Sequence, residues 1–348
     1  GLNAICAMIR TRHKFDYNLN AILSRLLYTR ILFPSSKRCS YKDSFRFIEQ
    51  PDFELHQVYR ALSVLAEESD YIQSRLFKNS LRIAERRTEV IYYDCTNFYF
   101  EIEEAEDDKQ YGLSKENRSL PIVEMGLFMD RDGIPLAFCI HPGNENEQKT
   151  LIPLEEKLIQ KFDMSKFVVC TDAGLSSATN RYFNNYDKAD GTRGFITTQS
   201  VKKMKKHLEK WMMEPDGWYL HGSGTKKTYS LSELDEEGDL EKIFYKSRWI
   251  KEKVDIVLDG KTQKKELEQQ LIVTFSLKYR NYLRSIRNAQ VERAMKTVEG
   301  GAKTVEHKRQ NDPKRFIKAD HATAEGEAAE KTRYYLDEKA IEKEEMYD

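Results

Sequence analysis

The sequence predicts an α/β protein whose central part follows the order βββαβαβ. The spacing of apolar residues changes near residue 89, from a helical period to one typical of strands. Further apolar runs then alternate with amphipathic segments, which is the pattern of strands joined by helices. Two of the runs, residues 90–93 and 167–171, are each followed at once by an aspartate. We therefore expect a compact α/β unit at residues 89–200.

Residues 1–88 are predicted to form a helical N-terminal domain. From residue 17 onward apolar residues recur on one helical face, and Pro34 and Pro51 divide the pattern into separate helices. This region holds 15 Lys and Arg against 9 Asp and Glu, a modest basic excess that solvated helices often show.

The elements expected in the α/β unit follow from its apolar periodicity. Gly133, which tolerates a positive φ, predicts a hairpin between the second and third strands. The predicted strands are 89–101, 121–130, 134–141, 166–172 and 194–199, and the predicted helices are 151–162 and 176–186.

Residues 201–348 are more charged and less regular. Strand-like pieces occur at 218–220, 243–250 and 271–275, and a helix is expected at about 277–298. We interpret this region as a β-rich insertion with a charged helical segment.

The overall composition excludes several classes of protein. Lys plus Arg and Asp plus Glu number 57 each, so net charge gives no argument for a polyanionic partner. Five widely spaced cysteines, without a Cys-x-x-Cys pair, support neither a disulfide framework nor a zinc site. Since no apolar run approaches the length of a membrane span, we expect no membrane association and a cytoplasmic protein.

Asp94 and Asp172 are the candidate catalytic and metal-binding residues. A carboxylate set into an apolar strand costs several kcal/mol unless a partner compensates it. If the first and fourth strands are neighbours, both carboxylates reach one sheet edge, where a shared Mg²⁺ would offset their repulsion. Such a site is typical of phosphoryl transfer. Taken alone, Asp172 is equally compatible with a turn or helix N-cap role.

Two basic segments are candidate contacts for the phosphates of DNA. The loop 111–118 contains Ser114, Lys115 and Arg118, and the run 201–207 contains Lys202 and Lys203. Either segment is also compatible with a solvated connection or helix face.

Taken together, these residues resemble the DDE-type transposases of bacterial insertion sequences. The resemblance is to the branch whose nuclease domain is interrupted by a β-rich insertion. Its segments lie in family order at 93–101, 111–118, 125–127, 132–136, 142–144, 171–177, 275–280 and 284–287.

The resemblance implies a ribonuclease-H-like catalytic core in which Asp94 and Asp172 are the first two metal-binding acids, with Mg²⁺ or Mn²⁺ as cofactor. The family's third acid is a glutamate on a late helix that also carries Tyr, Arg and Lys at set spacings. Glu292 lies in a helical segment but lacks the Tyr and Lys partners. The chain begins with Gly and ends at residue 348 without a turn or cap signal, so we expect truncation at both ends. The third acid is then expected beyond residue 348.

By resemblance the protein is a transposase that cleaves and transfers DNA strands by two-metal phosphoryl transfer. Its expected partners are the element's terminal repeats and target DNA, both double-stranded, on which it forms a homodimer in the bacterial nucleoid. Residues 1–88 are expected to bind the terminal DNA.

One alternative is a catalytically incomplete, DNA-binding remnant of a transposase. Another is an aspartyl-phosphate phosphatase built on Asp94, but that chemistry normally places a second acid two residues later, where Thr96 stands.

Overall fold

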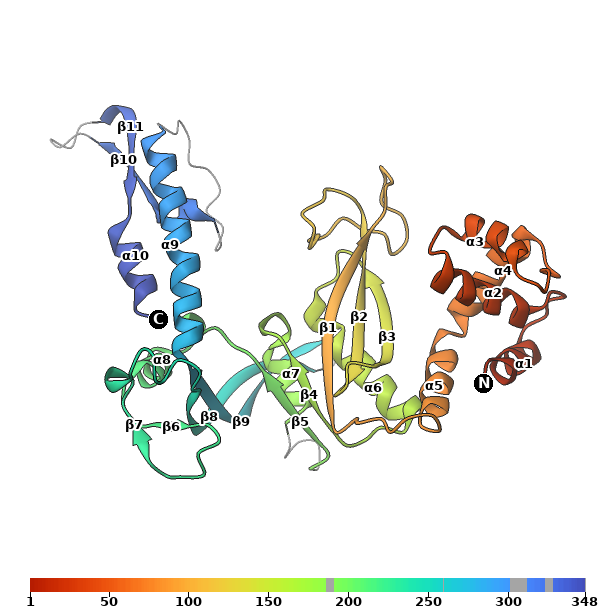
Figure 1. The fold of residues 1–348 in the computed structure, drawn as a ribbon, viewed down its shortest axis with the longest axis horizontal. Coiled ribbons are helices and arrows are strands. Elements are labelled where there is room, and N and C mark those ends of the chain that lie inside the picture. The colour runs from red at the N-terminus through yellow and green to blue at the C-terminus, as the bar shows by residue number, and fades with distance from the viewer. Residues whose placement is uncertain (186–190, 259, 301–311, 323–327, 348) are drawn as a thin grey trace. The chain divides into compact units, whose positions relative to one another are not determined.

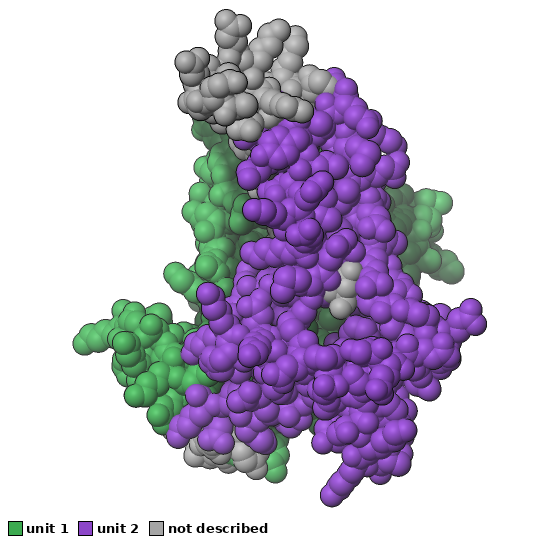
Figure 2. Space-filling view, turned by 90° about the vertical axis from the view of Figure 1, so that its left-hand side faces the viewer, with its two compact units in different colours: residues 1–200, 252–267 green, residues 201–251, 268–348 purple. Residues whose placement is uncertain are grey.

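The computed structural model describes residues 1–185, 191–258, 260–300, 312–322 and 328–347. The chain divides into two compact units, coloured separately in Figure 2. The first comprises residues 1–200 and 252–267, and the second comprises residues 201–251 and 268–348. Within the described ranges, no helix has both the length and the apolar character needed to cross a membrane.

The first unit begins with helices that enclose a small apolar core. They are α1 (Leu2–Arg12), α2 (Leu19–Leu32), α3 (Lys37–Asp43), α4 (Leu55–Glu67) and α5 (Ser69–Ser80). Ile9, Ile22 and Val58, from three of these helices, are fully buried against one another. The predicted breaks at Pro34 and Pro51 are confirmed, because they separate α2 from α3 and α3 from α4. Helix α1 lies inside the predicted helical domain but precedes residue 17, where the apolar periodicity was recognised.

A five-stranded mixed sheet follows, in the order β3-β2-β1-β4-β5 (Figure 1). Its central strand, β1, pairs antiparallel with β2 and parallel with β4. Strand β3 is antiparallel to β2, and β5 is parallel to β4. This order and these directions confirm the predicted ribonuclease-H-like core. The strands are β1 (Val90–Tyr99), β2 (Ile122–Asp130), β3 (Pro135–Pro142), β4 (Phe167–Thr171) and β5 (Arg193–Thr197).

One face of this sheet carries the main core. Alternate residues of β1, including Ile91 and Tyr93, point to this face and are buried, as expected for a two-residue period. Helix α6 (Leu151–Phe162) packs there with Leu154 and Leu158, and α5 adds Phe77. The predicted hairpin is confirmed, because Gly133 adopts a φ of 77° between β2 and β3. Helix α7 (Ala178–Phe183) follows β4; its predicted end, Tyr186, lies outside the described residues.

The second unit combines a four-stranded sheet, in the order β7-β6-β8-β9, with a long helix and a further strand pair. The predicted strand-like pieces 243–250 and 271–275 correspond to the beginning of β8 and the end of β9, which are both much longer strands. Residues 252–267, the turn-proximal part of β8 and β9, group with the first unit, where Val257 N donates to Thr179 Oγ1 at 3.0 Å. The elements are α8 (Lys206–Met213), β6 (Trp218–Leu220), β7 (Thr228–Tyr229), β8 (Phe244–Leu258), β9 (Lys261–Phe275), α9 (Leu277–Glu299), β10 (Ile317–Ala322), β11 (Ala328–Leu336) and α10 (Glu338–Glu345).

A buried glutamate joins α6 to the residues just after α7. Glu155 is fully buried, and Asn184 Nδ2 donates to both of its carboxyl oxygens, at 2.9 and 2.8 Å. Burial raises the pKa of Glu155 to about 8, against the lowering effects of Asn184 and Arg193. Asn184 Oδ1 is buried and accepts no hydrogen bond from the described residues. If the side-chain amide of Asn184 is rotated by half a turn, so that Oδ1 and Nδ2 exchange places, protonated Glu155 can donate a hydrogen bond to Oδ1.

This pair predicts a pH-dependent stability. Because folding raises the pKa of Glu155, the contribution of Glu155 to the free energy of unfolding is complete below about pH 4.5 and is lost as pH rises toward 8. The loss is on the order of 4 kcal/mol across that window. Glu155→Gln should remove this part of the pH dependence in urea unfolding measured from pH 5 to 8. The matched control Glu85→Gln, at an exposed position, should keep it. An unchanged pH profile in Glu155→Gln would contradict the assignment.

Candidate active site

Strand pairing brings Asp94 and Asp172 to the same place on the sheet. Strands β1 and β4 run parallel, with Val90 opposite Val168 and Tyr92 opposite Cys170. Continuing this register by two residues aligns Asp94 with Asp172, and Asp172 keeps an extended backbone with φ −77° and ψ −178°. Neighbouring strands lie about 4.8 Å apart. By this extrapolation Asp94, within β1, stands level with Asp172, which directly follows the end of β4.

Both aspartates lie on the face of the sheet opposite the α6 core. Tyr93 and Val169 point into that core, so the alternating residues Asp94 and Asp172 point the other way. The side chain of Asp94 is 70% exposed, and Asp172 is also exposed. The prediction that Asp94 is costly because it is buried is therefore wrong. What brings the acids together is strand register and not desolvation.

The backbone and carboxylate of Asp172 are both held by local hydrogen bonds. Its Oδ1 accepts from Leu175 N at 3.2 Å and so caps the short helix η3 (Ala173–Leu175), which confirms the N-cap interpretation. Its carbonyl oxygen accepts from Thr197 Oγ1 of β5 at 3.1 Å. A Cβ at Gly174 would lie 3.3 and 3.5 Å from the two carboxylate oxygens, so glycine leaves that side open.

The position of Asp94 depends on its buried neighbour Tyr93. The phenol of Tyr93 hydrogen bonds to Thr150 Oγ1 at 2.5 Å, just before α6 begins. Burial raises the pKa of this phenol, so it stays protonated. Across the strand pair, a Cβ at Gly126 would come within 2.0 Å of the Tyr93 hydroxyl, so only glycine leaves room for the ring. This packing fixes β1 directly beside Asp94.

Lys115 connects the loop before β2 to the acids. Its ammonium donates to the carbonyl oxygen of Cys95. It lies 3.9 Å from Asp94 Oδ1 and 3.9 Å from Glu147 Oε1. Of the predicted DNA contacts, the structure thus brings Lys115 to Asp94. A cation at this place partly neutralises the carboxylates around it.

Two further glutamates lie near Lys115, and sequence reasoning missed both: Glu147, and Glu124 on the opposite face of the sheet from Asp94. Glu147 lies in η2 (Glu147–Lys149), which contacts η3 after Asp172; Asn180 Nδ2 donates to carbonyls of both segments, at 3.0 Å each. Glu124, on β2, is 5% exposed, and its Oε2 has no partner among the described residues. The alternation of buried residues along β2 would have placed Glu124 on the inner face. Glu147 carries no such signal.

The pKa of Glu124 is raised to about 7. Burial is the main cause, and the charges of Glu147 and Glu145 act in the same direction. The ammonium of Lys115 opposes them. Glu124 therefore takes up a proton at a higher pH than an exposed glutamate does.

The remaining predicted DNA contacts are divided between the two units of the chain. Arg118 stacks over Tyr99 at 4.1 Å from the ring centroid and pairs with Glu116 at 3.0 Å. Ser114 lies on the same loop, and its hydroxyl is buried without a partner among the described residues. Lys202 and Lys203 belong to the second unit, where Lys202 pairs with Glu344.

The donors at this site suit a hard divalent cation. Aspartate oxygens are ligands that Mg²⁺ and Mn²⁺ accept, and such ions usually complete their shells with water and substrate phosphate. Exposure and the opening beside Gly174 leave the two carboxylates accessible. In the described part of the chain, however, no three His, Cys, Asp or Glu side chains gather closely enough to hold a metal by themselves.

No protein-family model and no curated protein matches the sequence. Matching solved structures include a Mos1 transposase paired-end complex with left transposon end, 11% identical over 53% of this chain and 60% of that chain, with a TM-score of 0.22. A piggyBac transposase synaptic complex with hairpin DNA is 10% identical over 78% of this chain and 57% of that chain, with a TM-score of 0.33. The chain spans about three fifths of the length of these two structures. Matches this weak assign no residue roles.

The electrostatic coupling around Glu124 predicts opposite effects for two substitutions. Removing the negative charge in Glu147→Gln should lower the pKa of Glu124 below about 7, and removing the positive charge in Lys115→Met should raise it. Carbon-13 NMR titration of labelled glutamates measures both shifts, with Glu124→Gln assigning the resonance. Glu116→Gln, at an exposed position of the same loop, is the control and should change little. Shifts of the same sign in both variants would contradict this arrangement.

Proposed function

We propose that the chain contains the catalytic core of a DNA transposase that cleaves and joins DNA strands by metal-dependent phosphoryl transfer. The observation that carries the proposal is the register of β1 and β4, which aligns Asp94 with Asp172 on an exposed sheet face. The order of sequence segments that resembles DDE transposases of bacterial insertion sequences supports it.

In this proposal Asp94 and Asp172 hold Mg²⁺, or Mn²⁺ in its place. A divalent cation bound there neutralises phosphate charge and activates the attacking hydroxyl or water. The chain's own residues supply the geometry: Leu175 N orients the carboxylate of Asp172, and Tyr93 fixes the strand beside Asp94. Lys115 lies close enough to Asp94 to balance its charge when no cation is bound.

The finer parts of the proposal concern the partners. The bound DNA is double-stranded, comprising an element's terminal repeats and its target, and two copies of the protein act together on it in the bacterial cytoplasm. Residues 1–88, the loop residues Ser114 and Arg118, and Lys202 and Lys203 contribute phosphate contacts.

A second function, DNA binding without catalysis, is favoured by one observation. In the ranges that the structure describes, no third acid joins the two aspartates in a group able to hold a metal. A remnant of this kind would bind duplex DNA and leave it uncut.

Substitution of either aspartate tests the proposal. Asp94→Asn and Asp172→Asn should each weaken Mg²⁺ binding, measured by calorimetry, and slow cleavage of duplex DNA, both by roughly 100-fold or more. The reason is that an amide oxygen carries no charge to offset the cation's lost hydration. Asp107→Asn is the matched control, at an exposed position with a φ of 49° that asparagine tolerates.

Three results separate the possibilities. If Asp94→Asn and Asp172→Asn lose both Mg²⁺ binding and DNA cleavage while Asp107→Asn keeps them, the transposase proposal is supported. Unaltered cleavage by Asp94→Asn contradicts it. Tight DNA binding by the wild type without any Mg²⁺-dependent cleavage supports the remnant.

A further inference from the structure

Helix α2 carries apolar residues on two opposite faces. Its inner face packs into the core of the N-terminal domain, where Ile22 is fully buried. A surface helix normally presents polar side chains on its outer face. The outer face of α2 instead carries four apolar side chains in the spacing i, i+1, i+4 and i+5, which places them together. They are Leu27 (45% exposed), Tyr28 (48%), Ile31 (76%) and Leu32 (58%).

The exposed apolar surface continues from α2 onto the segment between α3 and α4. The ring of Phe47 lies beside Tyr28, with centroids 6.0 Å apart. Arg25 of α2 stacks over the same ring and donates to the carbonyl oxygen of Glu49 at 2.7 Å. Ile48, between these two anchored residues, is completely exposed. We refer to five residues as the α2 patch: Leu27, Tyr28, Ile31, Leu32 and Ile48.

The α2 patch is large enough for a stable contact between proteins. Its five side chains together expose on the order of 600 Å² of mostly apolar surface. The largest apolar patch on a typical monomer covers roughly 300 to 600 Å² and often marks an interaction site. Two such patches in contact would bury on the order of 1,200 Å², which is the lower limit for a stable and specific interface.

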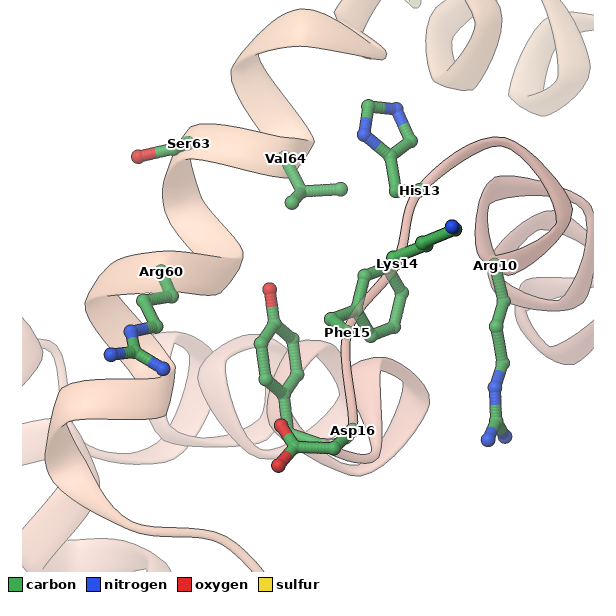
Figure 3. A pocket seen from close by; sticks show the side chains of 9 residues that line it. Arg10, His13, Lys14, Phe15, Asp16, Arg60, Ser63 and Val64 are labelled. Carbon is green, nitrogen blue, oxygen red and sulfur yellow. The ribbon is translucent and has the colours of Figure 1, made fainter.

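A cavity of about 830 Å³ in the same domain is a poorer candidate for such a contact (Figure 3). Its wall includes the charged side chains of Arg10, Lys14, Asp16 and Arg60, and none of the five residues of the α2 patch. A partner that gains affinity by burying apolar surface therefore fits the α2 patch and not this cavity.

We propose that the α2 patch joins two copies of this chain around a two-fold axis. Each copy then contributes the same residues, so the contact closes as a dimer. The charges of α2 allow this pairing. Arg25 is already paired with Glu49 of its own copy at 3.4 Å, and Arg30 lies on another face of the helix from Tyr28. The choice of a second copy as the occupant rests on the proposed function, in which two copies act together.

Sedimentation velocity of the full chain, without DNA and in EDTA, tests the proposal over a range of protein concentrations. The wild type should form dimers as concentration rises. Ile31→Glu should weaken dimerisation by about 100-fold or more, because the contact would bury an uncompensated charge from each copy. Ile31→Leu should still dimerise. Ile83→Glu is the matched control, since it makes the same change at an isoleucine of this domain that is 87% exposed outside the patch.

A second variant keeps the test independent of folding. Ile48→Glu changes a fully exposed residue outside the helices and should also weaken dimerisation. Circular dichroism checks the fold of each variant. A wild type that stays monomeric, with or without duplex DNA, would overturn the proposal and leave the patch to a different protein. Dimers that persist in both glutamate variants would overturn it as well, because another surface would then join the copies.

Dimerisation and DNA cleavage are measured separately, so the two proposals can fail independently. If the wild type dimerises through the α2 patch but never cleaves DNA, the proposed function fails and the dimer contact stands. If the wild type cleaves DNA with Mg²⁺ while Ile31→Glu and Ile48→Glu remain dimeric, the contact through α2 fails and the proposed function stands.

Discussion

The parallel pairing of β1 with β4 is the constraint on which the rest of the site depends. One face of these strands is committed to the core with α6, so their polar residues can point only to the opposite face. A slip of one residue in this register would turn one aspartate into the core. Because Ile91, Tyr93 and Val169 fill that core, such a slip is strongly disfavoured. Apolar packing on one face therefore fixes a pair of carboxylates on the other.

The charged groups near Asp94 and Asp172 differ in how far they are exposed to solvent. Asp94 and Asp172 are exposed, Glu147 is partly exposed and Glu124 is buried, with Lys115 close to Asp94 and Glu147. The exposed pair can meet a cation from solvent at little cost in desolvation. The buried Glu124 instead responds to its neighbours through its pKa. If a cation binds beside Asp94 as proposed, it would compete with the ammonium of Lys115, and the pKa of Glu124 would respond to the displaced lysine.

Much of the core could be predicted from sequence because its strands obey simple periodicity. Val90–Tyr99 and Phe167–Thr171 are apolar and β-branched, and their predicted limits differ from the observed ones by one or two residues. Strands β8 and β9 were only partly predicted, since the polar residues on either side of their turn carry no clear alternation. Glu147 could not be found in this way, because it joins the site through contacts of a short loop helix.

The most direct test of the central claim is anomalous X-ray diffraction from crystals of the full chain soaked in Mn²⁺. We expect one peak with an oxygen of Asp94 and an oxygen of Asp172 both within about 2.3 Å, and loss of that peak in Asp172→Asn crystals. Two results would contradict a shared metal site. One is a peak whose ion contacts only one of the two aspartates. The other is the absence of any peak, with the two carboxylates pointing away from each other.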